Sequence, residues 1–280
     1  MMELSIITIN YNNAVGLKKT LDSMAMQTCT DFEHIIVDGA STDDSVEMIR
    51  EYENALISRP SPLASHLKWI SEPDTGIYNA MNKGIRLAHG EYTLMLNSGD
   101  YLVDEQVIEK VLLLLDGTDI IQGNTISVIN NKEIINQGYA KSDISFIDVY
   151  SGNFLHQATF AKRILFEQYG YFDESYKIGG DTVFFLKALG LGNASFVYRD
   201  INIAYFDGDG ISANHTPYWN HQREIEDRMY DKLLPNRLLR LCKEDGYKIN
   251  MYNQISSHRF LKKCMMLLHK IANILDKIAK

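Results

Sequence analysis

Short runs of apolar residues alternate with longer amphipathic segments over the first hundred residues of the chain. The runs contain many β-branched residues and end in turn-forming residues, as is typical of buried strands: 4–9, 32–37, 67–70 and 92–96. Between them lie segments whose apolar residues recur near every 3.6 positions, as in helices that pack on a sheet: 15–25, 46–56 and 77–88. Strands that alternate with helices predict an α/β fold with a parallel sheet.

The pattern changes after residue 119. Ile126–Ile129 and Ile134–Ile135 flank Asn130-Asn131, which predicts a hairpin and therefore an antiparallel part of the sheet. From about residue 218 the apolar spacing becomes helical. We expect a mixed, mostly parallel sheet flanked by helices in a first domain over 1–217, and a C-terminal helical extension over 218–280.

Composition and length fit a globular protein that works inside the cell. The chain has 280 residues, of which 45% are apolar and 23% are charged, so it can bury a core. No run approaches the ~18 apolar residues that a membrane span needs, and the N-terminus does not resemble a signal peptide. The three cysteines, Cys29, Cys242 and Cys264, lie far apart without metal-ligand spacing. We therefore expect reduced thiols and a cytoplasmic location.

Charge is unevenly distributed along the chain. The net charge is −8, but residues 258–280 contain six basic residues and one aspartate, which leaves a strongly acidic remainder. An acidic body argues against nucleic acid as a partner, because phosphate contacts need a basic face. Read as a helix, 258–280 has a broad apolar stripe with lysines mostly beside it. It either packs on protein or lies at the surface of an anionic membrane, in peripheral contact with its inner face.

Polar residues with useful chemistry follow the predicted strands. Asp38 comes after the second strand and Asp100 after the fourth, so both are expected at one crevice beyond the carboxyl ends of the strands. Asp100 is a candidate ligand of a divalent metal, because hard cations prefer carboxylate oxygens. Lys83 is a candidate to neutralise a phosphate, and its alternative is a solvated lysine on a helix. Turn formation alone is the alternative for both aspartates.

Three segments together resemble the motifs of family 2 inverting glycosyltransferases, which have the GT-A fold: Ser5–Asn12, Ile36–Asp43 and Leu96–Asp100. The resemblance covers roughly residues 3–210 and implies a nucleotide-sugar donor, with the end of the first strand and Asp38 at the base and ribose. Asp100 matches the last acid of the motif that binds the metal–diphosphate, Mg²⁺ or Mn²⁺. The usual Asp-x-Asp pattern is altered there, because Asn97 and Gly99 stand where acids are common. The donor-binding residues expected on this basis are Thr8, Asn10, Tyr11, Asp38, Lys83, Asn97 and Ser98.

The second half of the chain supplies residues for the acceptor. The family's catalytic base is an aspartate that opens a helix, and Asp181 matches it, although Gly180 replaces the glutamate that often precedes it. An aspartate suits the task of taking a proton from the acceptor hydroxyl. The alternative role for Asp181 is a helix N-cap. His156 and Gln157 are expected at the acceptor, and a hydrogen-bonded structural role is the alternative for His156.

These features predict a metal-dependent, inverting glycosyltransferase. The expected donor is a UDP-hexose or UDP-N-acetylhexosamine, and the expected acceptor is a glycan or lipid-linked saccharide of a bacterial surface polysaccharide. A non-catalytic nucleotide-sugar-binding or scaffolding protein of the same fold is an alternative, given the missing acids at Asn97, Gly99 and Gly180. A nucleotidyltransferase is disfavoured, because the turn 10–13 has neither the glycine nor the lysine of a phosphate loop.

Overall fold

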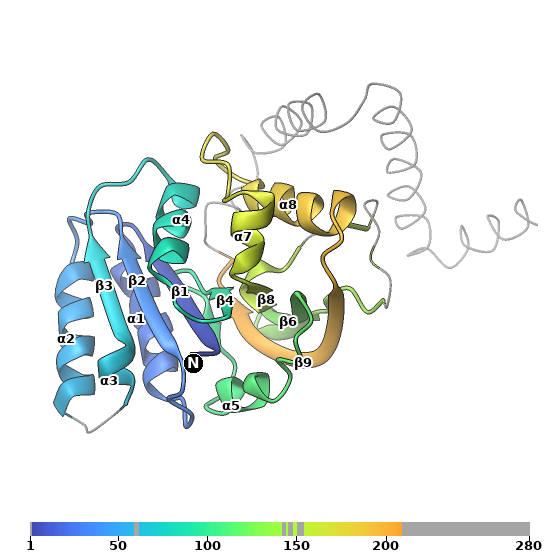
Figure 1. Cartoon of the computed structure of the whole chain (residues 1–280). Coiled ribbons are helices and arrows are strands. Elements are labelled where there is room, and N and C mark those ends of the chain that lie inside the picture. Colours follow the sequence, from blue (N-terminus) through green and yellow to red (C-terminus); the bar gives the residue numbers. More distant parts are fainter. Residues whose placement is uncertain (1, 59–61, 142–143, 145–147, 150–153, 209–280) are drawn as a thin grey trace, which may run out of the picture.

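The strands of the protein form one curled sheet that runs through the whole described part of the chain (Figure 1). The structure is a computed structural model and describes residues 2–58, 62–141, 144, 148–149 and 154–208. The order of strands in the sheet is β3-β2-β1-β4-β8-β6-β9-β5, and β7 pairs with β6 at the side.

The first four of these strands are parallel neighbours. They are β1 (Leu4–Asn10), β2 (Glu33–Asp38), β3 (Leu67–Ser71) and β4 (Tyr92–Met95). β1, β2 and β4 are buried along their whole length, which explains why their apolar residues do not alternate strictly with polar ones. Asn10 is in register with Asp38, and Asp38 with Ser71, so these polar residues lie side by side at the carboxyl ends of the strands.

Helices cover both faces of the sheet. Leu4 and Ile6 belong to a core shared with α1 (Ala14–Ala25), α2 (Ser45–Ser58), α3 (Leu63–His66) and α5 (Val107–Leu112). Ile7 and Ile9 point the other way, because side chains alternate along a strand. Their core includes α4 (Ile77–Leu87), α7 (Ile164–Tyr169), α8 (Gly180–Phe185) and the π-helical segment η2 (Leu186–Leu191).

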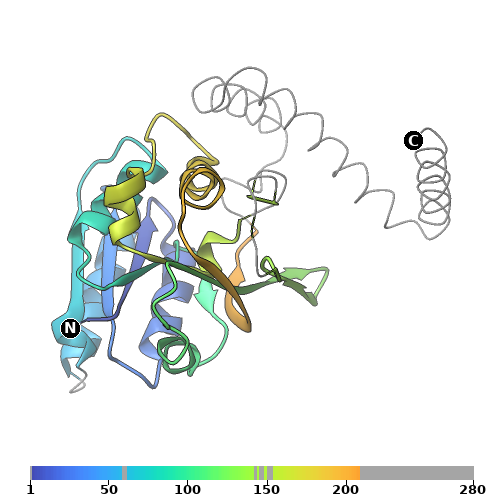
Figure 2. The ribbon, with the colours of Figure 1, turned by 45° about the vertical axis from the view of Figure 1, so that its right-hand side comes forward.

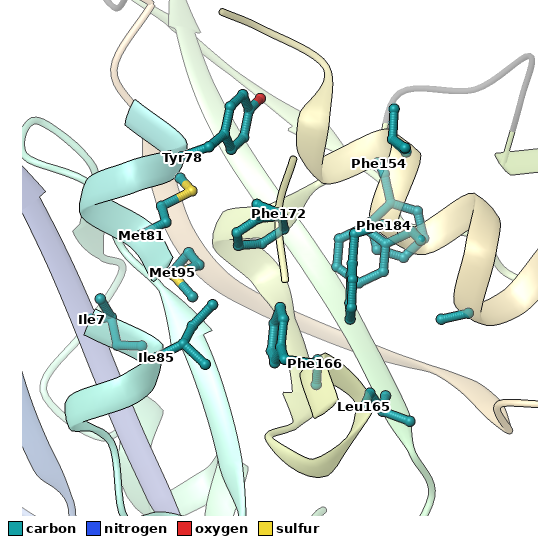
Figure 3. Close-up of a cluster of buried hydrophobic side chains, with 14 of the residues drawn as sticks. Ile7, Tyr78, Met81, Ile85, Met95, Phe154, Leu165, Phe166, Phe172 and Phe184 are labelled. Carbon is teal, nitrogen blue, oxygen red and sulfur yellow. The ribbon is translucent and has the colours of Figure 1, made fainter. Parts of the chain in front are cut away.

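A cluster of aromatic rings ties α4 to α7 and α8 on this second face (Figure 3). The rings of Phe166 and Phe184 are stacked with centroids 4.3 Å apart, and Phe172 meets both of them edge-on. Tyr78, in the first turn of α4, packs its ring against Phe172 at 5.6 Å. This packing fixes the first turns of α4 and α8 relative to each other, and both turns contribute to the site described below.

The second half of the sheet is mixed. It contains β5 (Tyr101–Leu102), β6 (Ile120–Ile129), β7 (Lys132–Asn136), β8 (Thr159–Lys162) and β9 (Phe196–Phe206), with the 3-10 helix η1 (His156–Ala158) just before β8. β6 pairs in parallel with β9, whereas β4–β8, β6–β8, β6–β7 and β5–β9 are antiparallel. β6 and β7 form the predicted hairpin, which projects from the body (Figure 2). Asn130 and Asn131 both adopt positive φ, as a two-residue type I′ turn requires.

The prediction of a mixed α/β sheet flanked by helices is confirmed. The predicted extension over 218–280 and its boundary at 217 lie outside the described residues. No helix in the described part of the chain has both the length and the apolar character to cross a bilayer.

Candidate active site

Asp38 lies at the carboxyl edge of the parallel strands and is fully buried. Its Oδ1 accepts hydrogen bonds from Asn10 Nδ2 at 2.8 Å and Ser41 Oγ at 2.6 Å, and its Oδ2 accepts from Ser41 N at 2.9 Å and Ser71 Oγ at 2.7 Å. Burial acts to raise the pKa of Asp38, but these donors hold it below the usual value. Asp38 therefore fixes the strand-end loop, and its contact with a nucleotide stays a prediction.

The end of β1 places its three predicted donor residues differently. Thr8 is fully buried, and its hydroxyl lies 3.1 Å from His34 Nε2 inside the sheet. The Oδ1 atom of Asn10 is buried and has no protein partner among the described residues. Tyr11 is 66% exposed. Of the three, only Tyr11 is thus exposed, whereas Asn10 is buried beside Asp38 and Thr8 supports the strand from within.

The loop Asn97–Asp100 after β4 is held against α1. Asn13 caps α1 through its own side chain, and its amide nitrogen donates to the Ser98 carbonyl at 3.2 Å and to Ser98 Oγ at 3.3 Å. The Thr20 hydroxyl donates to the Asp100 carbonyl at 2.7 Å and accepts from Gly99 N at 3.1 Å. The end of β4 and the first turns of α1 therefore form one rigid unit.

Asp100 is the buried carboxylate of this loop, with 5% of the residue exposed. Its Oδ1 accepts from the backbone N–H of Asp207 at 3.0 Å. Burial raises the pKa of Asp100 to about 7, while the charge of His156 and the Asp207 N–H oppose this rise and the Asp207 charge adds to it. The Asp207 carboxylate forms an ion pair with Lys19 at 3.2 Å, and it lies beside this loop, because a Cβ atom at Gly99 would be 3.0 Å from its Oδ2.

Asp100 and Asp207 could supply only part of the coordination of a divalent cation. The described residues contain no cluster of three or more His, Cys, Asp or Glu side chains arranged for a metal ion. Asp100 and Asp207 offer oxygen ligands, which suit Mg²⁺ or Mn²⁺ when substrate phosphates and water supply the remaining ligands. The residues are compatible with a metal that arrives with a diphosphate rather than with a metal cage.

Asp181 lies in the first turn of α8 and is connected to the loop after β4. Tyr78 Oη donates to Asp181 Oδ1 at 3.1 Å, and His156 Nδ1 lies 3.1 Å from Asp181 Oδ2. On the other side of the ring, His156 Nε2 lies 3.2 Å from Asn97 Nδ2. The N-cap of α8 is Gly179, without a side-chain cap, so capping does not explain Asp181. The Asp181 side chain keeps 15% of its surface exposed, which leaves a route for a substrate.

The charges of Asp181 and His156 stabilise each other. Burial acts to raise the pKa of Asp181, but the His156 hydrogen bond and charge, the N–H of Thr182 and the Tyr78 hydroxyl lower it below the usual value. Burial acts to lower the pKa of His156, but Asp181, with a further contribution from Asp100, raises it. Asp181 is therefore ionised near neutral pH and able to accept a proton.

Residues 5–185 match the family model described as Glycosyl transferase family 2. The chain belongs to glycosyl transferase family 2. It is 30% identical to "PGL/p-HBAD biosynthesis glycosyltransferase" of Mycobacterium bovis over 82% of this chain and 83% of the relative. It is 31% identical to "Poly(ribitol-phosphate) beta-N-acetylglucosaminyltransferase TarS" of Staphylococcus aureus, over 38% of this chain and 18% of that protein.

Solved structures share the GT-A fold of this family 2 chain. The crystal structure of S. aureus TarS 1–349 in complex with UDP-GlcNAc has a TM-score of 0.64 at 20% identity and covers 85% of this chain and 69% of that one. The mannosyltransferase from Pyrobaculum calidifontis in complex with GDP-Man and Mn²⁺ has a TM-score of 0.59 at 17% identity and covers 98% of this chain and 80% of that one. The expected fold and family are confirmed.

Two further predicted residues of this family 2 chain have mainly protein contacts. Lys83 Nζ forms an ion pair with Glu72 at 2.8 Å and donates to the Pro73 carbonyl at 2.9 Å, at the end of β3. Gln157 lies buried within η1, next to His156. A role for Lys83 at a phosphate and for Gln157 at an acceptor stays a prediction.

Sequence reasoning assigned no individual role at the family 2 site to Tyr78, Ser41 or Asp207. Ser41 lies inside the motif Ile36–Asp43, and its hydroxyl joins Asn10 and Asp38. Tyr78 and Asp181 are separated by 103 positions, so their contact has no local signal in the sequence. The one available hint was the polar hydroxyl of a tyrosine on the buried face of α4.

Proposed function

We propose that the chain transfers a sugar from a nucleotide-sugar donor to a glycan or lipid-linked saccharide of a bacterial surface polysaccharide, with inversion at the anomeric carbon. The observation that carries this proposal is the hydrogen-bonded path from Asp181 through His156 to Asn97. It connects an ionised, partly accessible carboxylate to the strand-end loop at which family 2 motifs place the donor diphosphate.

The reaction proposed is a single displacement. Asp181 takes the proton of an acceptor hydroxyl while that oxygen forms a bond to the anomeric carbon. The bond between the anomeric carbon and the diphosphate oxygen breaks, and the nucleoside diphosphate leaves with the electron pair. Attack from the face opposite to the leaving group inverts the configuration, and no covalent enzyme intermediate is needed.

Asp100 and Asp207 are the residues proposed to hold Mg²⁺ or Mn²⁺ together with the donor diphosphate. A bound divalent cation supplies charge stabilisation for the leaving diphosphate. The chain's own contribution is the rigid loop Asn97–Asp100, which α1 fixes through Asn13 and Thr20. Lys83 is a further proposed positive charge at the same sheet edge.

The proposed donor is a UDP-hexose or UDP-N-acetylhexosamine, bound with Asn10, Tyr11, Asp38, Asn97 and Ser98 at its nucleotide end. The complexes of related fold contain UDP-GlcNAc and GDP-Man, so the experiment has to vary the nucleotide as well as the sugar. Residues 258–280 lie outside the described part of the chain. Their peripheral contact with the inner face of the cell membrane remains a proposal based on their sequence.

The function is tested by incubating the full chain with a panel of UDP- and GDP-sugars, with Mg²⁺, Mn²⁺ or EDTA, and by analysing the products. We expect slow hydrolysis of one UDP-sugar to UDP and free sugar, and loss of this activity in EDTA. With pyrophosphate added, release of sugar 1-phosphate and UTP would instead indicate a nucleotidyltransferase. Absence of both turnover and binding across the panel would contradict the proposal and favour a scaffolding role.

A further inference from the structure

Both oxygens of the Asp181 carboxylate are bonded by side chains to which the proposed reaction has not yet given a part. Tyr78 Oη forms a hydrogen bond to Oδ1 and His156 Nδ1 forms one to Oδ2, and each of the two distances is 3.1 Å. The two donors come from separate elements, the first turn of α4 and the short helix η1. With one donor on each oxygen, the carboxylate cannot rotate without breaking hydrogen bonds to a charged group.

Gly180 is the reason that Tyr78 can reach Asp181. A Cβ atom at position 180 would lie 2.9 to 3.1 Å from three atoms of the Tyr78 ring. The ring has little room to withdraw, because Tyr78 is 4% exposed and packs on Phe172 (Figure 3). The absence of a side chain at Gly180 therefore makes room for the Tyr78 ring beside Asp181.

His156 is oriented from both of its ring nitrogens. Asp181 is ionised and only accepts hydrogen bonds, so Nδ1 carries the proton that it shares with Oδ2. On the other side of the ring, Nε2 lies 3.2 Å from the side-chain amide nitrogen of Asn97. This amide can donate to a neutral ring through its nitrogen or accept from a protonated ring through its oxygen. The loop at the end of β4 thereby sets the angle of the ring that bonds Asp181.

We propose that Tyr78 and His156 are positioning residues, which hold the Asp181 carboxylate by one oxygen each, and that Gly180 is required for the Tyr78 contact. The inference rests on the proposed function of Asp181 as the base. Holding the carboxylate in place favours the reaction, because a proton acceptor misplaced by about 1 Å can cost roughly 100-fold in rate. The remaining lone pairs of the two oxygens stay available for the acceptor hydroxyl.

The test compares kcat and donor affinity in a set of full-length variants. Tyr78→Phe keeps the packed ring and removes the donor. The His156→Asn amide occupies the place of Nδ1 and can still bond Asp181, whereas His156→Gln reaches the place of Nε2 and contacts only Asn97. Gly180→Ala adds the Cβ that displaces the Tyr78 ring. Tyr52→Phe is the matched control, because Tyr52 is also a buried tyrosine whose hydroxyl bonds a buried histidine, His34, at 3.2 Å.

We expect Tyr78→Phe, His156→Gln and Gly180→Ala to lower kcat by about 10- to 100-fold, with UDP affinity by calorimetry and donor KM nearly unchanged. His156→Asn is expected to retain most of kcat, and Tyr52→Phe all of it. Gly180→Ala should add little in the Tyr78→Phe background, because the hydroxyl it displaces is already absent. Thermal unfolding of each variant shows whether the fold is retained.

Unchanged kcat in Tyr78→Phe and His156→Gln would overturn the inference. A loss in His156→Asn with normal rates in His156→Gln would also overturn it, because the Asn97 contact alone would then matter. Asp181→Asn distinguishes failure of this inference from failure of the proposed function. If Asp181→Asn is inactive while the other variants are normal, only the inference fails, and if Asp181→Asn is active, the base assignment fails as well.

Discussion

Three aspartates at the site differ in how many hydrogen bonds each receives. Asp38 receives four and Asp181 is bonded on both oxygens, and the donors hold both pKa values below the usual range. For Asp100 burial prevails and raises the pKa to about 7. A cation that compensates a buried charge therefore benefits Asp100 most.

We predict that Asp100→Asn removes the metal-dependent part of UDP binding. The amide keeps an oxygen that can accept from the Asp207 N–H, but it loses the charge that a divalent ion requires. In the native chain, metal-dependent affinity should rise as pH increases through about 7, where Asp100 becomes ionised. In Asp100→Asn this rise should be absent.

Calorimetric titration with UDP, with and without Mn²⁺ at several pH values, checks this prediction. Asp104→Asn is the control, because Asp104 is a surface aspartate paired with Lys110. Equal metal dependence in the native chain and Asp100→Asn would remove Asp100 as a ligand.

At the scale of elements, His34 joins β1, β2 and α2. Its ring lies between the Thr8 hydroxyl at 3.1 Å and the Tyr52 hydroxyl at 3.2 Å, and it is fully buried. Burial lowers the pKa of His34 to about 3, so the ring is neutral in the folded chain. The unfolded chain binds a proton there below about pH 6.5, and the folded chain does so only near pH 3.

This difference predicts a loss of stability in mild acid. As pH falls below about 6.5, the unfolded state gains a proton that the folded state cannot bind, and up to about 2 kcal/mol is lost by about pH 5. His34→Gln should show a smaller loss over the same interval, although it is less stable at neutral pH. Urea unfolding of both proteins at neutral and mildly acid pH measures this, and parallel losses would show that other groups are responsible.

The elements also show how far sequence patterns reach. Short runs rich in apolar residues identified β1, β2 and β4, and Asn130-Asn131 identified the β6–β7 turn, because each signal is local. β5 has only two residues, and β9 is half-buried along most of its length, so neither has a clear period. Their pairing depends on contacts between distant segments, such as Tyr101 with Tyr205.

On the scale of the whole molecule, the site combines two parts of the chain. The parallel strands bring Asn10, Asp38 and the Asn97–Asp100 loop to one edge, and this arrangement was predicted from the sequence. η1 and α8 bring His156 and Asp181 to the same edge from the second half. Motif resemblance found these two residues, but not the hydrogen bond between them or the bond from Tyr78 to Asp181, which depends on the packing of α4 against α8.

The central claim is that Asp181 is the base of a sugar transfer, and Asp181→Asn tests it most directly. Asparagine has the same shape, its oxygen can accept from His156, and its amide can donate to the Tyr78 hydroxyl, so the fold should be retained. General-base catalysis typically contributes about 100- to 10,000-fold, and we expect a loss in that range. Asp119→Asn is the control, because Asp119 bonds Ser195 and has no part in the proposed reaction.

The transfer rate and the donor affinity are measured on the same preparation of each variant. The donor is the one that the panel of UDP- and GDP-sugars identifies. The account predicts that Asp181→Asn binds the donor almost as the native chain does and transfers its sugar at least about 100-fold more slowly. Transfer by Asp181→Asn at a rate near that of the native chain would contradict the account.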